Sequence, residues 1–447
     1  MGKEESCRGQ KLYEDIMQEP RPEQQLLELD QTLVQEPTGV AAASLAGLLH
    51  RPLKAFRHRN YRLFFGGQII SLTGTWLQSV TQGWLVFTLT NSALLLGVVG
   101  AISALPILVF SLFAGVVADR FSKRNLLVIT QICLMLLALV LGILTHTGVV
   151  TVYHIIAVGF LLGTVQSLDA PTRQSFVIEM VGREDLSNAI ALNSATFNSA
   201  RIFGPALAGA VIAWLGIAGA FFMNAVSFIP VIIALLMMRV PPVPARPREP
   251  VIHSLKEGFR FIRGQRTVTG LLVLAAAVSI FSMPYMVLMP VFARDILKVG
   301  AKGLGYLVSC VGFGALIGAL VISTLGDIKG KGKLLLAGNL TFCAMLILFS
   351  FSRYAPLSMA LLVVAGWGIM TSMALTNTLI QTSTPNELRG RVMSVYVLMF
   401  MGMAPLGSFQ GGLVAHWLGA PAAVRIGAIV CASAAILLSP RFIRSTA

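Results

Sequence analysis

Two ionisable side chains, Asp169 and Arg201, lie in or beside long apolar runs, where a charged group can do chemistry. Asp169 ends the run 150–169, and Arg201 lies inside the run 188–213. A carboxyl group there can couple the movement of protons to another process if its accessibility to protons changes. Asp169 is therefore the candidate coupling residue. Its alternative role is an ion pair with Arg173 at a helix end. A buried arginine is costly unless it faces a partner or a wet cavity, so Arg201 indicates a functional or latch role.

Uncharged polar side chains follow a helical spacing in two of the apolar runs. Residues three or four positions apart lie on one face of a helix, so each set forms a stripe. We expect both stripes to face a central cavity, and interhelical hydrogen bonding is the alternative. The first stripe comprises Gln68, Ser71, Thr75, Gln78 and Gln82, and the second comprises Ser194, Asn198, Arg201 and Pro205.

Methionine, tyrosine and asparagine side chains are further candidates for lining the cavity. Methionine is flexible and polarisable, so it suits bulky apolar ligands, although plain packing is its commoner use. The additional cavity candidates are Tyr285, Met289, Asn377 and Met403. None of these residues identifies a ligand by itself.

The elements that must position these residues are membrane-spanning helices. Only 12% of the 447 residues are charged and 55% are hydrophobic, whereas a soluble domain carries about 25% charged residues. With a mean hydropathy of +0.78, the chain is predicted to be an all-α polytopic membrane protein. Apolar runs of about 20 residues mark the spans. Twelve are predicted, at 63–88, 93–117, 125–145, 150–169, 188–213, 218–238, 268–291, 304–325, 334–352, 356–383, 392–416 and 421–440.

The placement of charge along the chain predicts the topology. Loops on one side collect most of the Lys and Arg residues, while the opposite loops hold Arg294, Lys298, Lys302 and Arg353. Because positive loops stay cytoplasmic, both termini are predicted to be cytoplasmic, in a bacterial-type inner membrane. The net charge of +15 and the pI of about 10.1 are therefore a topology signal. They argue against nucleic-acid binding, which needs a basic face on a soluble domain.

A proline-rich connection divides the chain into two sets of six spans. Proline cannot continue a helix, and five prolines lie between residues 241 and 250. The predicted organisation is an acidic cytoplasmic tail at 1–44, a basic amphipathic interfacial segment at 45–62, an N-terminal half at 63–238, a cytoplasmic linker at 239–267, a C-terminal half at 268–440 and a cytoplasmic tail at 441–447.

One loop motif recurs in the two halves. The run Gly115-Val116-Val117-Ala118-Asp119-Arg120-Phe121-Ser122-Lys123-Arg124 returns in degenerate form as Gly326-Asp327-Ile328-Lys329-Gly330-Lys331. The first run resembles the signature loop of the major facilitator superfamily, with Ser122 where glycine is usual. The resemblance covers nearly everything after residue 58 and implies two pseudo-symmetric six-helix halves. It also implies a conformational latch of Gly115, Asp119, Arg120, Arg124 and Asp327, in which Asp119 helps to hold the outward-facing state.

Further motifs indicate a branch of that superfamily. The runs Asp169-Ala170-Pro171-Thr172-Arg173-Gln174 and Leu388-Arg389-Gly390-Arg391-Val392 are similar to those of enterobactin exporters and macrolide efflux proteins. The run Gly204-Pro205-Ala206-Leu207-Ala208-Gly209 is similar to the fifth-helix motif of antiporters. For Gly204, Pro205 and Gly209 the alternative is a hinge and close helix packing. The resemblance implies antiport with protons.

Other classes of function lack their characteristic residues. The sequence has no Gly-x-x-x-x-Gly-Lys-Ser/Thr phosphate loop, and its 6 histidines and 5 cysteines show no metal-ligand spacing. We therefore expect no cofactor, no metal and no enzymatic activity. The chain is predicted to be a monomeric secondary transporter that exports amphipathic small molecules of the drug or siderophore type by alternating access. Its expected partners are the lipid bilayer, that substrate and protons. The alternatives are a lipid or lysophospholipid transporter and a non-transporting membrane scaffold or sensor.

Overall fold

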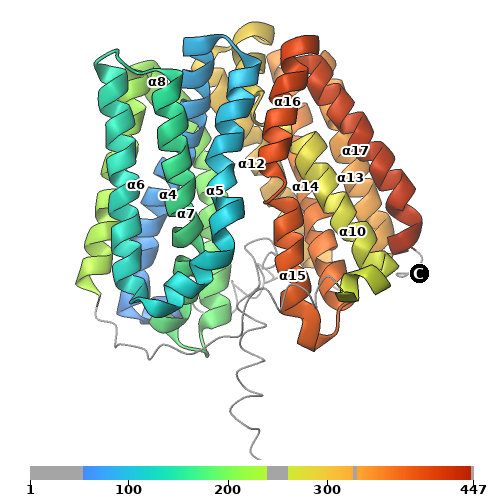
Figure 1. Cartoon of the computed structure of the whole chain (residues 1–447), viewed down its shortest axis with the longest axis horizontal. Helices are drawn as coiled ribbons and strands as arrows, with labels where there is room; N and C mark the ends of the chain where they lie inside the picture. The colour runs from blue at the N-terminus through green and yellow to red at the C-terminus, as the bar shows by residue number, and fades with distance from the viewer. Residues whose placement is uncertain (1–53, 239–259, 326–329, 444–447) are drawn as a thin grey trace, which may run out of the picture.

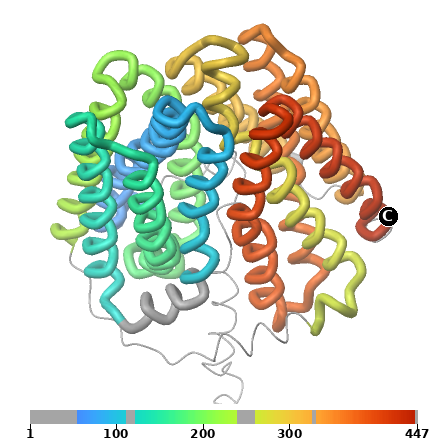
Figure 2. Tube along the Cα trace, turned by 45° about the horizontal axis from the view of Figure 1, so that its top comes forward, coloured from blue at the N-terminus to red at the C-terminus, as the bar shows by residue number. Residues whose placement is uncertain are grey.

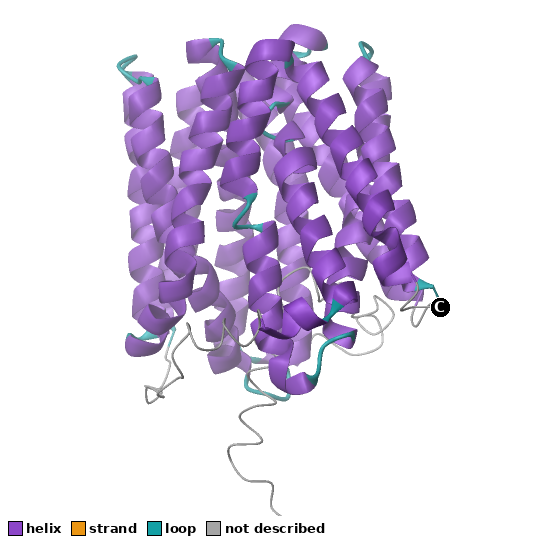
Figure 3. Ribbon diagram, turned by 45° about the vertical axis from the view of Figure 1, so that its right-hand side comes forward, coloured by secondary structure: helices purple, strands orange, loops and turns teal. Residues whose placement is uncertain are grey.

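The structure is a computed structural model that describes residues 54–238, 260–325 and 330–443, apart from the side chains of residues 111–120 and 325. The predicted acidic tail, most of the linker and of the last tail, and Asp327 therefore lie outside the described residues. Within the described ranges the chain is helical, and its helices are joined by short loops (Figure 3).

The N-terminal bundle starts with a short 3-10 helix, η2 (Lys54–Arg57), and continues as long α-helices. These are α4 (Arg59–Thr90), α5 (Ala93–Arg120), α6 (Lys123–His146), α7 (Val152–Val181) and α8 (Leu186–Met237). The 52 residues of α8 form two helices, because Gly216 has a non-helical backbone with a φ of 73°. Glycine adopts this conformation without steric cost. The predicted turn between the fifth and sixth spans is therefore confirmed.

The C-terminal bundle is less regular. Its long helices are α10 (Arg266–Ala277), α12 (Gly300–Leu325), α13 (Lys331–Phe351), α14 (Ala355–Thr382), α15 (Asn386–Phe400), α16 (Ala404–Leu418) and α17 (Ala420–Ile443). Between α10 and α12 the chain forms short π-helical, 3-10 and α-helical segments: η3 (Val278–Ser282), η4 (Met283–Tyr285), α11 (Met289–Val291) and η5 (Phe292–Ile296). The single helix predicted over 268–291 is thus wrong in detail, because Pro284 and Pro290 lack the N–H donor that a regular helix needs.

The helices are long and apolar enough to cross a membrane. Ten helical stretches of the described residues meet this condition, and one of them is the whole of α8, which Gly216 divides. The 32-residue α4 is not among them, because its polar stripe lowers its hydropathy. The predicted fold of twelve spans is consistent with this arrangement, in which α15 and α16 share the eleventh span.

The two bundles lie side by side, with the blue-to-green helices in one and the yellow-to-red helices in the other (Figures 1 and 2). Contacts between them are made by α8 with α12 and by α5 with α16. We call the helix ends near Arg59, Lys123 and Lys331 the basic end, and the opposite ends, near Asn91 and Gly300, the distal end.

Small residues let the bundles approach closely at the distal end. A Cβ added to Gly97 in α5 would lie 2.8 Å from Cα of Gly412 in α16, and one added to Gly209 in α8 would lie 2.8 Å from Cα of Lys302 in α12. Such contacts bring helix backbones together in the membrane without side-chain clashes. The bundles are therefore in tight contact at the distal end.

Candidate functional site

Asp169 lies well inside α7. The prediction that the fourth span stops at residue 169 is wrong, because α7 continues to Val181. At a rise of 1.5 Å per residue, Asp169 is about 18 Å from that end of the helix. The apolar run ended early because polar residues follow Asp169, yet its own side chain is buried, with 5% of the residue exposed.

A buried polar network holds the carboxylate of Asp169. Thr130 Oγ1 and Gln131 Nε2, both from α6, donate hydrogen bonds to its Oδ1 at 2.8 Å each. Arg173 Nε lies 3.6 Å from its Oδ2, and Ser71 of α4 donates to Gln131 Oε1 at 3.2 Å. Two uncharged donors from α6 thus accompany the expected arginine, and α4 joins the network through Gln131. Sequence reasoning missed Thr130 and Gln131, although both are polar residues inside a predicted span.

Arg201 lies at the contact between the two bundles. It is about 22 Å along α8 from Leu186 at 1.5 Å per residue, and so near the middle of this helix's first part. The hydroxyl of Ser309 in α12 donates to the backbone oxygen of the next residue, Ile202, at 2.6 Å. The structure therefore places the backbone of Arg201 at the interface of the two bundles, while Tyr285 is buried in the C-terminal bundle.

The first polar stripe divides into two groups. Gln68, Ser71 and Gln78 are buried within the N-terminal bundle, and Asn224 Nδ2 of α8 donates to Gln78 Oε1. Thr75 and Gln82 are partly exposed. Ser71 and Gln78 thus serve interhelical hydrogen bonding, and the partly exposed residues are available to a cavity.

The remaining cavity candidates differ in exposure. Met289 is fully buried, and Asn377 is buried with its Oδ1 accepting from Gln381 Nε2 at 2.7 Å. Met403 is partly exposed at the break between α15 and α16. Asn198 is also partly exposed, and its amide donates back to the Ser194 oxygen at 2.9 Å. Of this group, Met403 and Asn198 retain surface that a ligand could touch.

The glycine and proline residues of the antiporter-like run pack α8 against its neighbours. A Cβ on Gly204 would lie 2.5 Å from Cβ of Trp76 in α4, and Gly209 meets α12 at Lys302. The backbone oxygen of Pro205 approaches Gly305. The close-packing role is therefore present at all three residues.

Among the predicted latch residues, Arg124 is the one whose side chain the structure describes. Its Nε and Nη2 donate to the backbone oxygens of Leu235 and Leu236 at 2.6 and 2.7 Å. Arg124 thus ties the start of α6 to the last turn of α8 within one bundle. The side chains of Gly115, Asp119 and Arg120, and all of Asp327, lie outside the described residues.

A contact missed by sequence reasoning joins the bundles at the distal end. Arg294 of η5 donates from Nη1 to the backbone oxygen of Phe87 at 3.1 Å and from Nη2 to Asn91 Oδ1. Its guanidinium lies 3.9 Å from the ring centroid of Phe87, and Asp295 pairs with it at 2.7 Å. Arg294 therefore satisfies carbonyl groups at the end of α4 and links the two bundles, which no spacing pattern could reveal.

An ion-pair cluster lies at the basic end of the N-terminal bundle. Asp185, which precedes α8, accepts from Arg57 Nε at 2.7 Å and lies 2.8 Å from His58 Nε2. Its hydrogen bond with His58, together with the charge of Arg57, holds the pKa of the Asp185 carboxyl below its usual value. Ala55 N also donates to Asn188 Oδ1 at 3.0 Å. The cluster docks the segment before α4 onto the start of α8.

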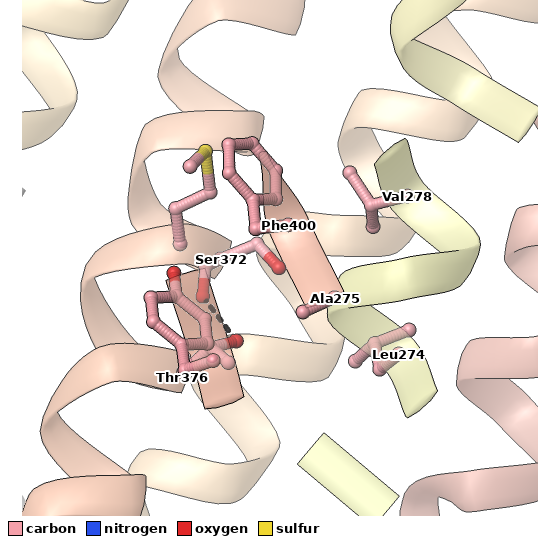
Figure 4. Close-up of a pocket in the computed structure, with 8 residues that line it drawn as sticks. Leu274, Ala275, Val278, Ser372, Thr376 and Phe400 are labelled. Atoms are coloured by element: carbon pink, nitrogen blue, oxygen red, sulfur yellow. Dashed lines mark hydrogen bonds between the residues drawn. The ribbon is translucent and has the colours of Figure 1, made fainter. Parts of the chain in front are cut away.

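A narrow pocket lies inside the C-terminal bundle, between α10, α14 and α15 (Figure 4). Thr376 Oγ1 donates to the backbone oxygen of Ser372 at its wall, at 2.8 Å. The pocket has room for about one water molecule, which is too little for an amphipathic substrate. Its lining residues are Leu274, Ala275, Val278, Ser372, Met373, Thr376, Tyr396 and Phe400.

Comparison with solved structures supports the fold. A nucleoside transporter aligns with a TM-score of 0.66 and 15% identity, over 88% of this chain and 99% of that one. A bacterial homologue of the iron transporter ferroportin, in its inward-facing state, aligns with a TM-score of 0.67 and 15% identity, over 87% and 99%. At this identity the likeness concerns the fold alone.

Sequence comparison defines the family. The family model described as transmembrane secretion effector matches residues 50–446. The staphyloferrin A transporter of Staphylococcus aureus is 25% identical over 368 residues, which cover 80% of this chain and 90% of the relative. The enterobactin exporter EntS of Shigella boydii is 26% identical over 366 residues, covering 80% and 85%. The chain therefore belongs to the transmembrane secretion effector family of the major facilitator superfamily, in the branch of the enterobactin exporters.

Proposed function

We propose that this chain exports amphipathic small molecules of the siderophore or drug type by alternating access, and that it is not an enzyme. The observation that carries the proposal is the pair of charged side chains far from the ends of their helices, the buried Asp169 and the partly exposed Arg201, in a fold of two bundles. Charged groups at membrane depth are costly and are kept where they bind a substrate or move an ion. The relatives named for siderophores support the same class of substrate.

The proposed orientation places the basic end and both termini in the cytoplasm of a bacterial inner membrane. The described basic residues support it, since Arg59, Lys123, Lys331 and Arg389 lie at or near helix ends on that side. With this orientation the tight contact at the distal end corresponds to a state closed toward the outside. A substrate would then enter from the cytoplasm, as export requires.

Proton coupling is the second part of the proposal. Asp169 is held by Thr130, Gln131 and Arg173, which stabilise its carboxylate, and the hydrogen bond from Ser71 to Gln131 ties the site to α4. Relative movement of α4, α6 and α7 would change these contacts and so the access to the carboxyl group, as a coupling residue requires. By resemblance, Asp119 and its latch partners would stabilise the opposite, outward-facing state.

Counterflow in proteoliposomes tests the export proposal. Vesicles preloaded with an unlabelled siderophore or macrolide should take up the labelled compound faster than protein-free vesicles, because exchange needs no energy source. A panel of siderophores, macrolides and lysolipids in which no member exchanges would contradict the transporter reading and favour a scaffold or sensor. Deletion of residues 1–45 is the matched test of the acidic tail. Unchanged exchange and assembly would leave the tail without a regulatory role.

A further inference from the structure

Both oxygens of the buried Asp169 carboxylate face hydrogen-bond donors. Thr130 Oγ1 and Gln131 Nε2 donate to Oδ1 at 2.8 Å each, and Arg173 Nε lies 3.6 Å from Oδ2. This arrangement suits the ionised carboxylate, which only accepts hydrogen bonds. A protonated carboxyl group has an O–H of its own, and a buried O–H needs an acceptor. If Asp169 carries protons, one of its neighbours must therefore be able to accept a hydrogen bond.

Two of the three neighbours are fixed as donors. The guanidinium of Arg173 has no acceptor atom. The side-chain oxygen of Gln131 already accepts from the hydroxyl of Ser71 in α4 at 3.2 Å. That contact sets the orientation of the Gln131 amide, with Nε2 toward Asp169, and turning the amide over would give up both of its hydrogen bonds.

Thr130 is different, because its hydroxyl has two acceptors within reach. Its Oγ1 lies 2.8 Å from Asp169 Oδ1 and 3.0 Å from the backbone oxygen of Leu127, one turn earlier on α6. A hydroxyl donates a single hydrogen and can accept at its two lone pairs. When the hydrogen points toward Leu127, as in a common helix back-bond, the Thr130 oxygen can accept from a protonated Asp169. Both forms of the carboxyl group are thus satisfied without movement of the heavy atoms.

The charged groups around Asp169 come from few elements. Helix α7 packs against α4, α5, α6 and α8, and the described charged side chain in contact with Asp169 is Arg173. Lys123 of α6 pairs with Glu179, which is about 15 Å along α7 from Asp169. The described side chains of α4 and α8 form no ion pair with Asp169. The ionisable residues of α5, which lie outside the described side chains, are Asp119 and Arg120.

We propose that Thr130 is the positioning residue that allows Asp169 to bind a proton at Oδ1. Its hydroxyl donates to the carboxylate, and it turns to the Leu127 oxygen and accepts from the carboxyl group once Asp169 is protonated. The inference rests on the proposed proton coupling and deepens it. The step is a proton transfer alone: Oδ1 gains the proton and later releases it, and no other covalent bond changes.

The test is a pH titration of the full chain in lipid, followed by infrared difference spectroscopy. The carbonyl band of a protonated carboxyl group that disappears in Asp169→Asn belongs to Asp169. Thr130→Val removes the hydroxyl, so the carboxylate loses a charge-assisted hydrogen bond, which is stronger than the neutral one lost by the acid. The midpoint of the band should therefore move by about one pH unit toward alkaline pH. An unchanged midpoint would overturn the proposal, and so would the absence of any band that Asp169→Asn removes.

Further variants separate the hydroxyl from simple packing. Thr130→Ser keeps the hydroxyl and should restore the wild-type midpoint. The matched control is Thr81→Val, since Thr81 of α4 is a fully buried threonine whose hydroxyl donates to the Leu77 oxygen at 2.8 Å. An equal shift in Thr81→Val would count against the proposal. If Thr130→Val does not fold, Thr130→Cys replaces it under the same criterion, because a thiol is a weaker donor and acceptor.

Transport measurements distinguish failure of this inference from failure of the proposed function. Export driven by a pH gradient in inverted vesicles should show the same displacement of its pH profile in Thr130→Val. A shifted infrared midpoint without gradient-driven export in the wild type would contradict proton coupling and leave the role of Thr130 standing. Gradient-driven export with a midpoint that ignores Thr130→Val would contradict the role of Thr130 and leave coupled export standing.

Discussion

The two bundles of this transporter bury different kinds of side chain. The N-terminal bundle buries two acids, Asp169 and Asp185, each with several donors. In the described part of the C-terminal bundle the buried polar side chains are all neutral, such as Asn339 and Asn377. The apolar cores differ as well. One large cluster fills the C-terminal bundle and extends to α4 and α8, whereas the rest of the N-terminal bundle has smaller, separate clusters.

The difference indicates that the two related halves of a pseudo-symmetric fold can have different functions. The charged groups with fixed hydrogen-bond donors belong to the bundle with the buried acids. The other bundle has irregular seventh and eleventh spans next to Met289 and Met403, and soft side chains adapt to varied ligands. We expect the first bundle to govern coupling and the second to govern the fit of the substrate.

The largest expected effect is that of Asp169→Asn. Asparagine keeps an oxygen that can accept from Thr130 and Gln131, yet it cannot bind or release a proton. Export driven by a pH gradient should fall to the level of empty vesicles, while counterflow without a gradient should persist. The measurement is uptake into inverted vesicles under both conditions.

The control comes from the other bundle. Glu387 is an exposed acid at the start of α15, and Glu387→Gln should leave gradient-driven export unchanged. Export that survives Asp169→Asn, or that collapses equally in Glu387→Gln, would remove the assignment of coupling to the N-terminal bundle.

Arg294→Ala should have the next largest effect, because it removes a contact that joins the two bundles at the distal end. The bonds to Phe87 and Asn91 are charge-assisted, but the Arg294 side chain is 29% exposed. Solvent screening reduces the value of such bonds, so we expect about a fivefold shift toward the outward-open state. The readout is labelling of a single cysteine at Gln82 by an impermeant maleimide in a cysteine-free background.

Arg294→Lys provides the control for this contact. Lysine keeps the charge and loses the bidentate geometry, so it should give an intermediate labelling rate. Equal labelling in the wild type and in Arg294→Ala would show that other distal contacts, such as that of Gly97 with Gly412, hold the bundles together without help.

Much of the fold follows from the sequence, because apolar runs and loop charge depend on local composition. The runs on either side of Gly216 are an example. The end of the fourth helix was mispredicted, since hydropathy counts the polar residues after Asp169 as its end although α7 continues to Val181. Thr130, Gln131 and Arg294 are partners across the fold, and no spacing along one helix identifies them. Arg425 was likewise overlooked as a charge within the last predicted span.

A smaller effect is expected at the basic end, from Asp185→Asn. The hydrogen bond from His58 and the charge of Arg57 lower the folded-state pKa of Asp185 below its usual 3.8. The carboxylate therefore contributes stability above that usual value, and the contribution is lost as pH falls through the lowered folded pKa. Asp185→Asn should lower the melting temperature at neutral pH, and the difference from the wild type should shrink under strongly acidic conditions.

Glu184→Gln is the neighbouring control. Its side chain is 88% exposed and 3.4 Å from Arg57, and exposed pairs contribute little, so its melting temperature should match that of the wild type. A difference for Asp185→Asn that stays constant down to strongly acidic pH would indicate lost packing instead of a lost charge interaction.

The smallest expected effect is that of Arg425→Gln, which allows the arginines of the two bundles to be compared. Each bundle has one arginine within a predicted span, and the two differ in what they touch. Arg425 lies over the ring of Phe351 at 4.6 Å within the C-terminal bundle, an interaction of about 0.5 to 1 kcal/mol at an exposed site. Its loss should lower the melting temperature slightly and leave transport unchanged, while Arg201→Gln should change substrate preference. A transport defect in Arg425→Gln as large as that in Arg201→Gln would mean that charge chemistry is not confined to the N-terminal bundle.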